Sequence, residues 1–94
     1  MQQLGCYRCN KDKVYEIPVF ERDDRDKLIK LKIEASILVV KELIQSYRLN
    51  HSTAKFITAH INITNGKCNR CNYSSLEDEN IICPKCKSLN FNWN

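Results

Sequence analysis

The cysteines of this chain come in closely spaced pairs. Two residues separate the members of each pair: Cys6 and Cys9, Cys68 and Cys71, and Cys83 and Cys86. Such a gap lets the chain curl so that both sulfurs face one point, which suits a metal ion better than a disulfide framework. The segment between the second and third pairs is long enough for a strand, a turn and a returning strand. We therefore predict one structural zinc ion, held by Cys68, Cys71, Cys83 and Cys86.

The C-terminal segment of the chain, from residue 67 to residue 94, resembles a zinc ribbon. The resemblance rests on these last two cysteine pairs, which a ribbon places at the ends of adjacent strands to complete one tetrahedral site. It implies a fold and a metal, but no single function, because ribbons occur in ribosomal proteins, transcription factors, polymerase subunits and adaptors. One departure is Lys87, which stands where many ribbons carry a glycine. We therefore expect the second turn around the metal to be shaped differently.

The first cysteine pair has no obvious partners. Cys6 and Cys9 need two more ligands to hold a metal ion, and the only histidines are His51 and His60. His60 falls on the apolar face of a predicted helix, which favours a packed histidine, with a ligand role as the alternative. Three arrangements stay open for this pair: a second zinc ion with His60, a zinc shared between two chains, and two unligated thiols. The expected cofactor is one zinc ion, or two in the first arrangement.

The same cysteines argue against catalysis, so we expect no enzyme activity. A catalytic zinc keeps an open coordination position, which four cysteines do not leave. Cys83-Pro-Lys-Cys86 looks like a redox motif in isolation. Redox pairs sit at a helix N-terminus, however, and the residues after Cys86 alternate like a strand.

Two helices are expected to form the body of the protein. Residues 23–49 predict one long amphipathic helix, uninterrupted by glycine or proline, with Asp23 and Asp24 suited to its N-terminus. Its apolar stripe consists of Ile29, Ile33, Ile37, Val40, Ile44 and Tyr47. A shorter helix is expected at 52–62. The apolar face of this second helix consists of Phe56, Ile57, His60 and Ile61.

Strands are expected near both ends of the chain. Tyr15, Ile17 and Val19 alternate with other residue types, which predicts a short N-terminal strand. At the C-terminus, apolar residues alternate with asparagines through Leu89, Asn90, Phe91, Asn92, Trp93 and Asn94. A strand there would have one apolar face, which we expect to pack toward the helix 23–49.

The predicted fold is therefore α+β. We expect a single small domain, 1–94, made of an N-terminal segment (1–20), a helical body (23–62) and the zinc ribbon (67–94). The formal net charge is +4, but a four-thiolate zinc site contributes about −2. The basic composition is therefore only weak support for a nucleic-acid partner. No secretory leader and no long apolar run is visible, so we expect a cytoplasmic chain with reduced thiols and no membrane partner.

The function that these features favour is a non-catalytic, zinc-stabilised adaptor that docks on a larger protein or ribonucleoprotein assembly. The candidate partner contacts are Arg8, Lys67, Arg70, Lys85, Lys87 and Trp93. A homodimer through Cys6 and Cys9, or through the long helix, stays open.

The alternative is a DNA-binding regulator in which helices 23–49 and 52–62 form a helix-turn-helix-like pair. The polar side chains of the second helix would be Ser52, Thr53, Lys55, Thr58 and His60. Only Lys55 is basic, whereas DNA-recognition elements usually carry several arginine or lysine contacts to phosphate. A short helix that packs across the long one is therefore favoured.

Overall fold

The computed structural model describes residues 2–6, 12–64, 66–71 and 73–93 of the 94-residue chain. Its elements, in chain order, are β1 (Gln2–Leu4), β2 (Tyr15–Ile17), α2 (Arg22–Glu34), α3 (Ser36–Ser46), α4 (His51–His60), β3 (Asn80–Ile82) and β4 (Leu89–Phe91). Strands β1 and β2 form one antiparallel hairpin, and β3 and β4 form a second. The predicted α+β class is confirmed.

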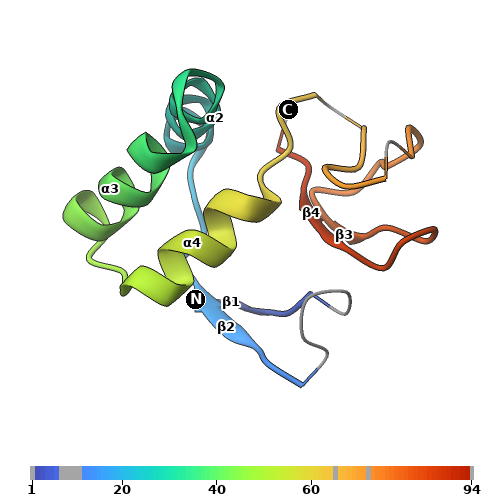
Figure 1. Ribbon diagram of the computed structural model, residues 1–94, viewed down its shortest axis with the longest axis horizontal. Coiled ribbons are helices and arrows are strands. Elements are labelled where there is room, and N and C mark those ends of the chain that lie inside the picture. The colour runs from blue at the N-terminus through green and yellow to red at the C-terminus, as the bar shows by residue number, and fades with distance from the viewer. Residues whose placement is uncertain (1, 7–11, 65, 72, 94) are drawn as a thin grey trace.

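Helix α4 lies at the centre of the molecule (Figure 1). It packs against α3 on one side and against β2 and β4 on the others. Asn50 precedes the helix, and its side-chain Oδ1 accepts a hydrogen bond of 2.8 Å from the backbone amide of Thr53. Such a cap satisfies one of the free amides at a helix N-terminus. The short helix predicted at 52–62 is therefore present.

The single helix predicted over 23–49 is wrong, because the chain breaks into α2 and α3 at Ala35. This residue is extended, with φ −167° and ψ 133°, and its amide closes α2 by donating to the Leu31 carbonyl oxygen at 2.9 Å. A straight helix over 23–49 would be about 40 Å long. The longest dimension of the whole molecule is 34 Å. Folding α3 back against α2 lets both helices contribute to one core.

The break divides the predicted apolar stripe. Ile29 and Val40 are buried in the core, as the periodicity predicts. Ile33 and Ile37, on either side of the break, are 61% and 58% exposed. Two residues of the stripe therefore lie outside the protein's own core.

The C-terminal strand joins the second hairpin to the helical body. Leu89, Phe91 and Trp93 are buried in the same cluster as residues of all three helices. Phe91 bridges Ile61 at the end of α4, and the Trp93 ring lies 5.6 Å from Cζ of Arg25 in α2. The predicted packing toward the segment 23–49 is present through Trp93 and Arg25, but the main contact of β4 is with α4.

Trp93→Ala should lower the free energy of unfolding by about 3–5 kcal/mol, because removing a buried aromatic ring leaves a cavity. The wild-type ring is only 7% exposed and lies 5.2 Å from the Phe91 ring and 5.4 Å from the Phe20 ring. Chemical denaturation followed by circular dichroism measures the loss. Val19→Ala, at a side chain that is 63% exposed, is the control and should change stability by less than about 0.5 kcal/mol.

The emission of the single tryptophan gives an independent reading in the wild-type protein. A red-shifted, readily quenched emission, together with unchanged stability of Trp93→Ala, would contradict the packing described above.

Candidate metal centre

The four cysteines predicted as ligands converge on one point. Their sulfur atoms all lie within 4.8 Å of one another, and the four residues are Cys68, Cys71, Cys83 and Cys86. The sulfurs of Cys68 and Cys86 are 3.6 Å apart, and those of Cys71 and Cys83 are 3.5 Å apart. Sulfurs around a regular tetrahedral zinc ion, with Zn–S bonds of about 2.3 Å, would be about 3.8 Å apart. The cluster predicted from the sequence is confirmed, and its geometry fits a metal ion.

Two tight turns carry the ligands, and backbone hydrogen bonds fix both. In the first, the amide of Cys68 donates to the carbonyl oxygen of Tyr73 at 2.7 Å. In the second, the amide of Lys87 donates to the carbonyl oxygen of Cys83 at 2.9 Å. We call these turns the first knuckle (68–71) and the second knuckle (83–86). The antiparallel pairing of β3 and β4 places both ends of the second knuckle side by side.

Lys87 adopts the conformation that glycine would favour. Its φ is 67°, in the left-handed region, although it is not a glycine. The expectation that the second knuckle would differ in shape at this position is therefore wrong, because lysine adopts the left-handed turn here. Gly66, before the first knuckle, has φ 80°, and a Cβ there would lie 3.3 Å from the Leu76 carbonyl oxygen.

Two thiols of the cluster, Cys68 and Cys86, have pKa values shifted in opposite directions. Burial opposes ionisation of Cys68, but hydrogen bonds from the amides of Cys71 and Arg70 and from the Asn90 side chain lower its pKa to about 6. Burial and the neighbouring cysteine sulfurs raise the pKa of Cys86 to about 12. Several thiolates cannot accumulate at this spacing without a cation, because like charges disfavour one another. A divalent cation would allow all four to ionise and to act as ligands.

Two asparagines near the C-terminus have roles that the sequence alone did not indicate: Asn90 contacts a ligand of the centre, and Asn92 fastens the loop of the ribbon. Asn90 donates a hydrogen bond to the Cys68 sulfur, with an Nδ2–Sγ distance of 3.5 Å. Asn92 accepts a hydrogen bond of 2.6 Å from the amide of Gly66 and donates to two carbonyl oxygens of the same loop. The alternation of asparagine and apolar residues was the only signal for these roles in the sequence. It predicts that the asparagines share one face of a strand, but it does not identify the residues that this face contacts.

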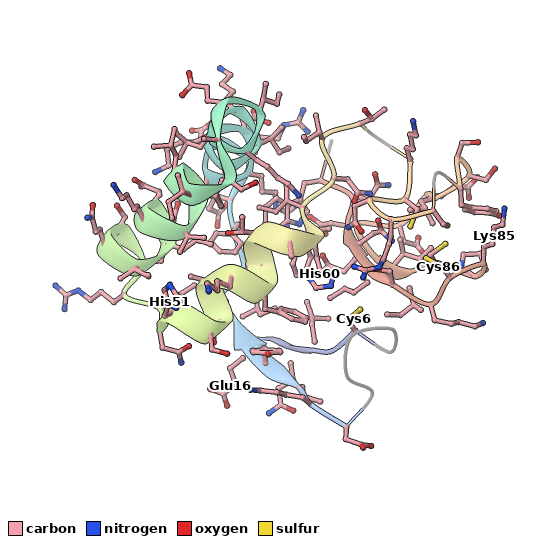
Figure 2. All side chains as sticks on the ribbon, in the orientation of Figure 1. Cys6, Glu16, His51, His60, Lys85 and Cys86 are labelled. Atoms are coloured by element: carbon pink, nitrogen blue, oxygen red, sulfur yellow. The ribbon has the colours of Figure 1, made fainter. Side chains whose placement is uncertain are left out.

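Cys6 and His60 lie outside the four-cysteine cluster. Cys6 is buried, and its sulfur accepts a hydrogen bond of 3.4 Å from the amide of Leu89. His60 is also buried; its Nδ1 donates to the Phe56 carbonyl oxygen at 2.6 Å, and its ring packs on the Phe56 ring at 4.5 Å. Figure 2 shows both residues nearer to the centre of the molecule than Cys86 is. The packed interpretation of His60 accounts for these contacts.

The second site considered for Cys6, Cys9 and His60 is incomplete among the residues that the structure describes. Cys9 lies outside the described residues, and so does the candidate contact Arg8. Within the described residues, the four-cysteine cluster is the one group with three or more metal-binding side chains close together.

The other candidate contacts differ in exposure. Four basic side chains in or next to the knuckles are exposed: Lys67, Arg70, Lys85 and Lys87. Figure 2 shows Lys85 at the outer end of the ribbon, away from the helices. Trp93 is buried, so it is not an exposed anchor for a partner.

The chain matches no protein-family model, no curated protein and no solved structure. Among the residues described, no helix has both the length and the apolar character needed to cross a membrane. Function is therefore inferred from the geometry of the chain itself.

Two variants test which cysteines bind the metal. Cys83→Ser should abolish stoichiometric metal binding, because it removes one of four converging ligands. Cys6→Ser/Cys9→Ser should retain about one metal ion per chain, because it leaves the cluster complete. Elemental analysis of protein purified without a chelator measures both. Loss of all metal from the Cys6→Ser/Cys9→Ser variant would show that the ligand assignment is wrong.

Proposed function

We propose that this chain is a non-catalytic, zinc-stabilised module that docks on a larger protein. The observation that carries the proposal is the exposure of two large apolar side chains, Ile33 and Ile37, at 61% and 58%. They flank Ala35, which is also exposed, and we call the three residues the elbow. Single exposed apolar residues are common on soluble proteins. These two belong to an amphipathic stripe whose other members pack in the core, which supports a role in contacting a partner.

Zinc is the metal that this donor set favours. Four thiolates in a tetrahedral arrangement select a soft or borderline cation over magnesium or calcium. A site closed by four protein ligands leaves no position for a substrate or an activated water, which supports a structural role. Its contribution is to fold the ribbon, since the binding energy of a structural zinc ion is folding energy.

A nucleic-acid partner is the second candidate, through the ribbon rather than through α4. Three of the polar side chains expected on a recognition helix are buried: Thr53, Thr58 and His60. The exposed surface of α4 then offers one basic residue, Lys55. The four exposed cations in or next to the knuckles take part in none of the ion pairs formed by the described residues. They favour contact with a polyanion, although Glu77 and Asp78 are exposed on the same ribbon.

Removing zinc should disrupt more than the ribbon. Chelation should unfold residues 67–94 and expose Trp93, because the strand that follows the second knuckle also fills the helical core. Tryptophan emission and amide hydrogen exchange, measured before and after chelation and after zinc is restored, follow the change. Unchanged emission in fully zinc-free protein would contradict this prediction.

Substituting the elbow should weaken docking without unfolding the protein. Ile33→Ser/Ile37→Ser removes two exposed apolar side chains, and burying each in a partner would contribute about 1.5–3 kcal/mol. The expected result is more than a tenfold loss of affinity for the captured protein, since each tenfold is about 1.4 kcal/mol. Capture from an extract of the source cells, with and without nuclease, identifies the partner, and its Kd is then measured with purified components.

The matched control is Val14→Ser/Val19→Ser, which removes two side chains of similar exposure, 57% and 63%, from outside the elbow. It should bind as the wild type does. Equal binding by the elbow variant would refute the elbow as the docking surface. Capture that disappears on nuclease treatment would instead support the nucleic-acid candidate.

A further inference from the structure

One side chain joins both halves of the metal centre. Asn90 is fully buried in the middle of β4, at 0% exposure. A buried amide side chain needs partners for its oxygen and its nitrogen, because an unpaired buried polar group is costly. Asn90 has partners for both: its Oδ1 accepts from the amide of Asn69 at 2.8 Å, and its Nδ2 donates to the carbonyl oxygen of Ser88 at 3.1 Å. The same Nδ2 lies 3.5 Å from the sulfur of Cys68.

Two of these partners lie on the first knuckle, and the third lies just beyond the second. Asn69 lies inside the first knuckle, between Cys68 and Cys71, and Ser88 follows the second knuckle after Cys86 and Lys87. Asn90 therefore connects the first knuckle to the strand that leaves the second, and the Ser88 carbonyl oxygen that it bonds also accepts from the amide of Cys83 at 2.9 Å. Asn90 also contacts one ligand sulfur directly.

The knuckle that Asn90 contacts is in turn fastened to the helical body. The side-chain Nδ2 of Asn69 donates to the carbonyl oxygen of His60 at 2.9 Å and to Oδ1 of Asn62 at 3.1 Å. The amide of Asn62 donates to the carbonyl oxygen of Phe91 at 3.0 Å, next to Asn90 on β4. These bonds close a loop from the end of α4, through the first knuckle and Asn90, back to β4. Hydrogen bonds arranged in this way can hold the two knuckles at the distance from each other that metal binding requires.

We propose that Asn90 is a positioning residue of the metal centre, which holds the two knuckles together and orients the Cys68 sulfur by a hydrogen bond. Residues that contact metal ligands without binding the metal commonly change metal affinity by about 10–100-fold when they are substituted. Asn90 acts through Cys68, through the Asn69 amide of the first knuckle and through the Ser88 carbonyl oxygen beside the second, and it does not replace any of the four ligands.

Asn92 provides a matched control on the same face of the strand. It is buried, and it accepts from the amide of Gly66 at 2.6 Å and donates to the carbonyl oxygens of Leu76 and Asp78 at 3.3 Å each. Its contacts fasten the loop of the ribbon but include no sulfur. A variant at Asn92 therefore reports the general cost of losing a buried asparagine near the centre.

The test compares Asn90→Ala with Asn92→Ala in the full chain. Zinc affinity is measured in buffers of fixed free zinc, and the absorption spectrum is recorded with cobalt(II) in place of zinc. Asn90→Ala should weaken zinc binding by about 10–100-fold. It should also shift the sulfur-to-cobalt charge-transfer band to lower energy, because the Cys68 sulfur loses a hydrogen bond. Asn92→Ala should lower resistance to denaturant, yet leave the band at its wild-type position.

Wild-type affinity and spectrum in Asn90→Ala would overturn the proposal. Equal losses of affinity in both variants, with unchanged cobalt spectra, would also overturn it, since Asn90 would then support only general stability. If Asn90→Ala does not fold, Asn90→Leu replaces it, because leucine keeps most of the side-chain volume but cannot donate a hydrogen bond to the sulfur. A shift of the band to lower energy in that variant would support the proposal, and an unshifted band would refute it.

Discussion

The convergence of four cysteine sulfurs to within 4.8 Å is the constraint on which the C-terminal region of this structure depends. Thiolates at that spacing repel one another, and a divalent cation between them removes the repulsion. We expect the ribbon to need that contribution, because its own buried cluster consists, among the residues that the structure describes, of Cys68, Leu76 and Cys83. So small an apolar core cannot offset the conformational entropy of ordering the loop, and small domains of this kind commonly depend on a metal.

Strand β4 connects that constraint to the rest of the protein. One face of the strand and its extension places Leu89, Phe91 and Trp93 in the helical core. The other face places Asn90 and Asn92 among the backbone groups of the ribbon. An ion pair between Arg25 of α2 and Glu79 of the ribbon adds a second link. Metal binding at the four cysteines would therefore stabilise the same strand that packs against α4 and shares one core cluster with α2 and α3.

The sequence predicted the local features and missed those that depend on distant contacts. The cysteine spacing and the alternation at 89–93 are local patterns, so the metal cluster and the apolar face of β4 could be predicted. The break at Ala35 could not, because alanine is the strongest helix former and no glycine or proline marks the site. The chain folds back there because a straight helix over 23–49 would be longer than the whole molecule. The hydrogen bonds of Asn90 likewise depend on the tertiary approach of the first knuckle, 21 residues away in sequence at Asn69.

The most direct test of the account is X-ray absorption at the zinc edge of the purified, metal-loaded protein. Four cysteine ligands predict a single shell of four sulfur atoms at about 2.3 Å. A shell containing nitrogen or oxygen at about 2.0–2.2 Å, or fewer than four sulfurs, would contradict it. That result would mean that another residue or a water completes the site and that the closed, structural centre described here is wrong.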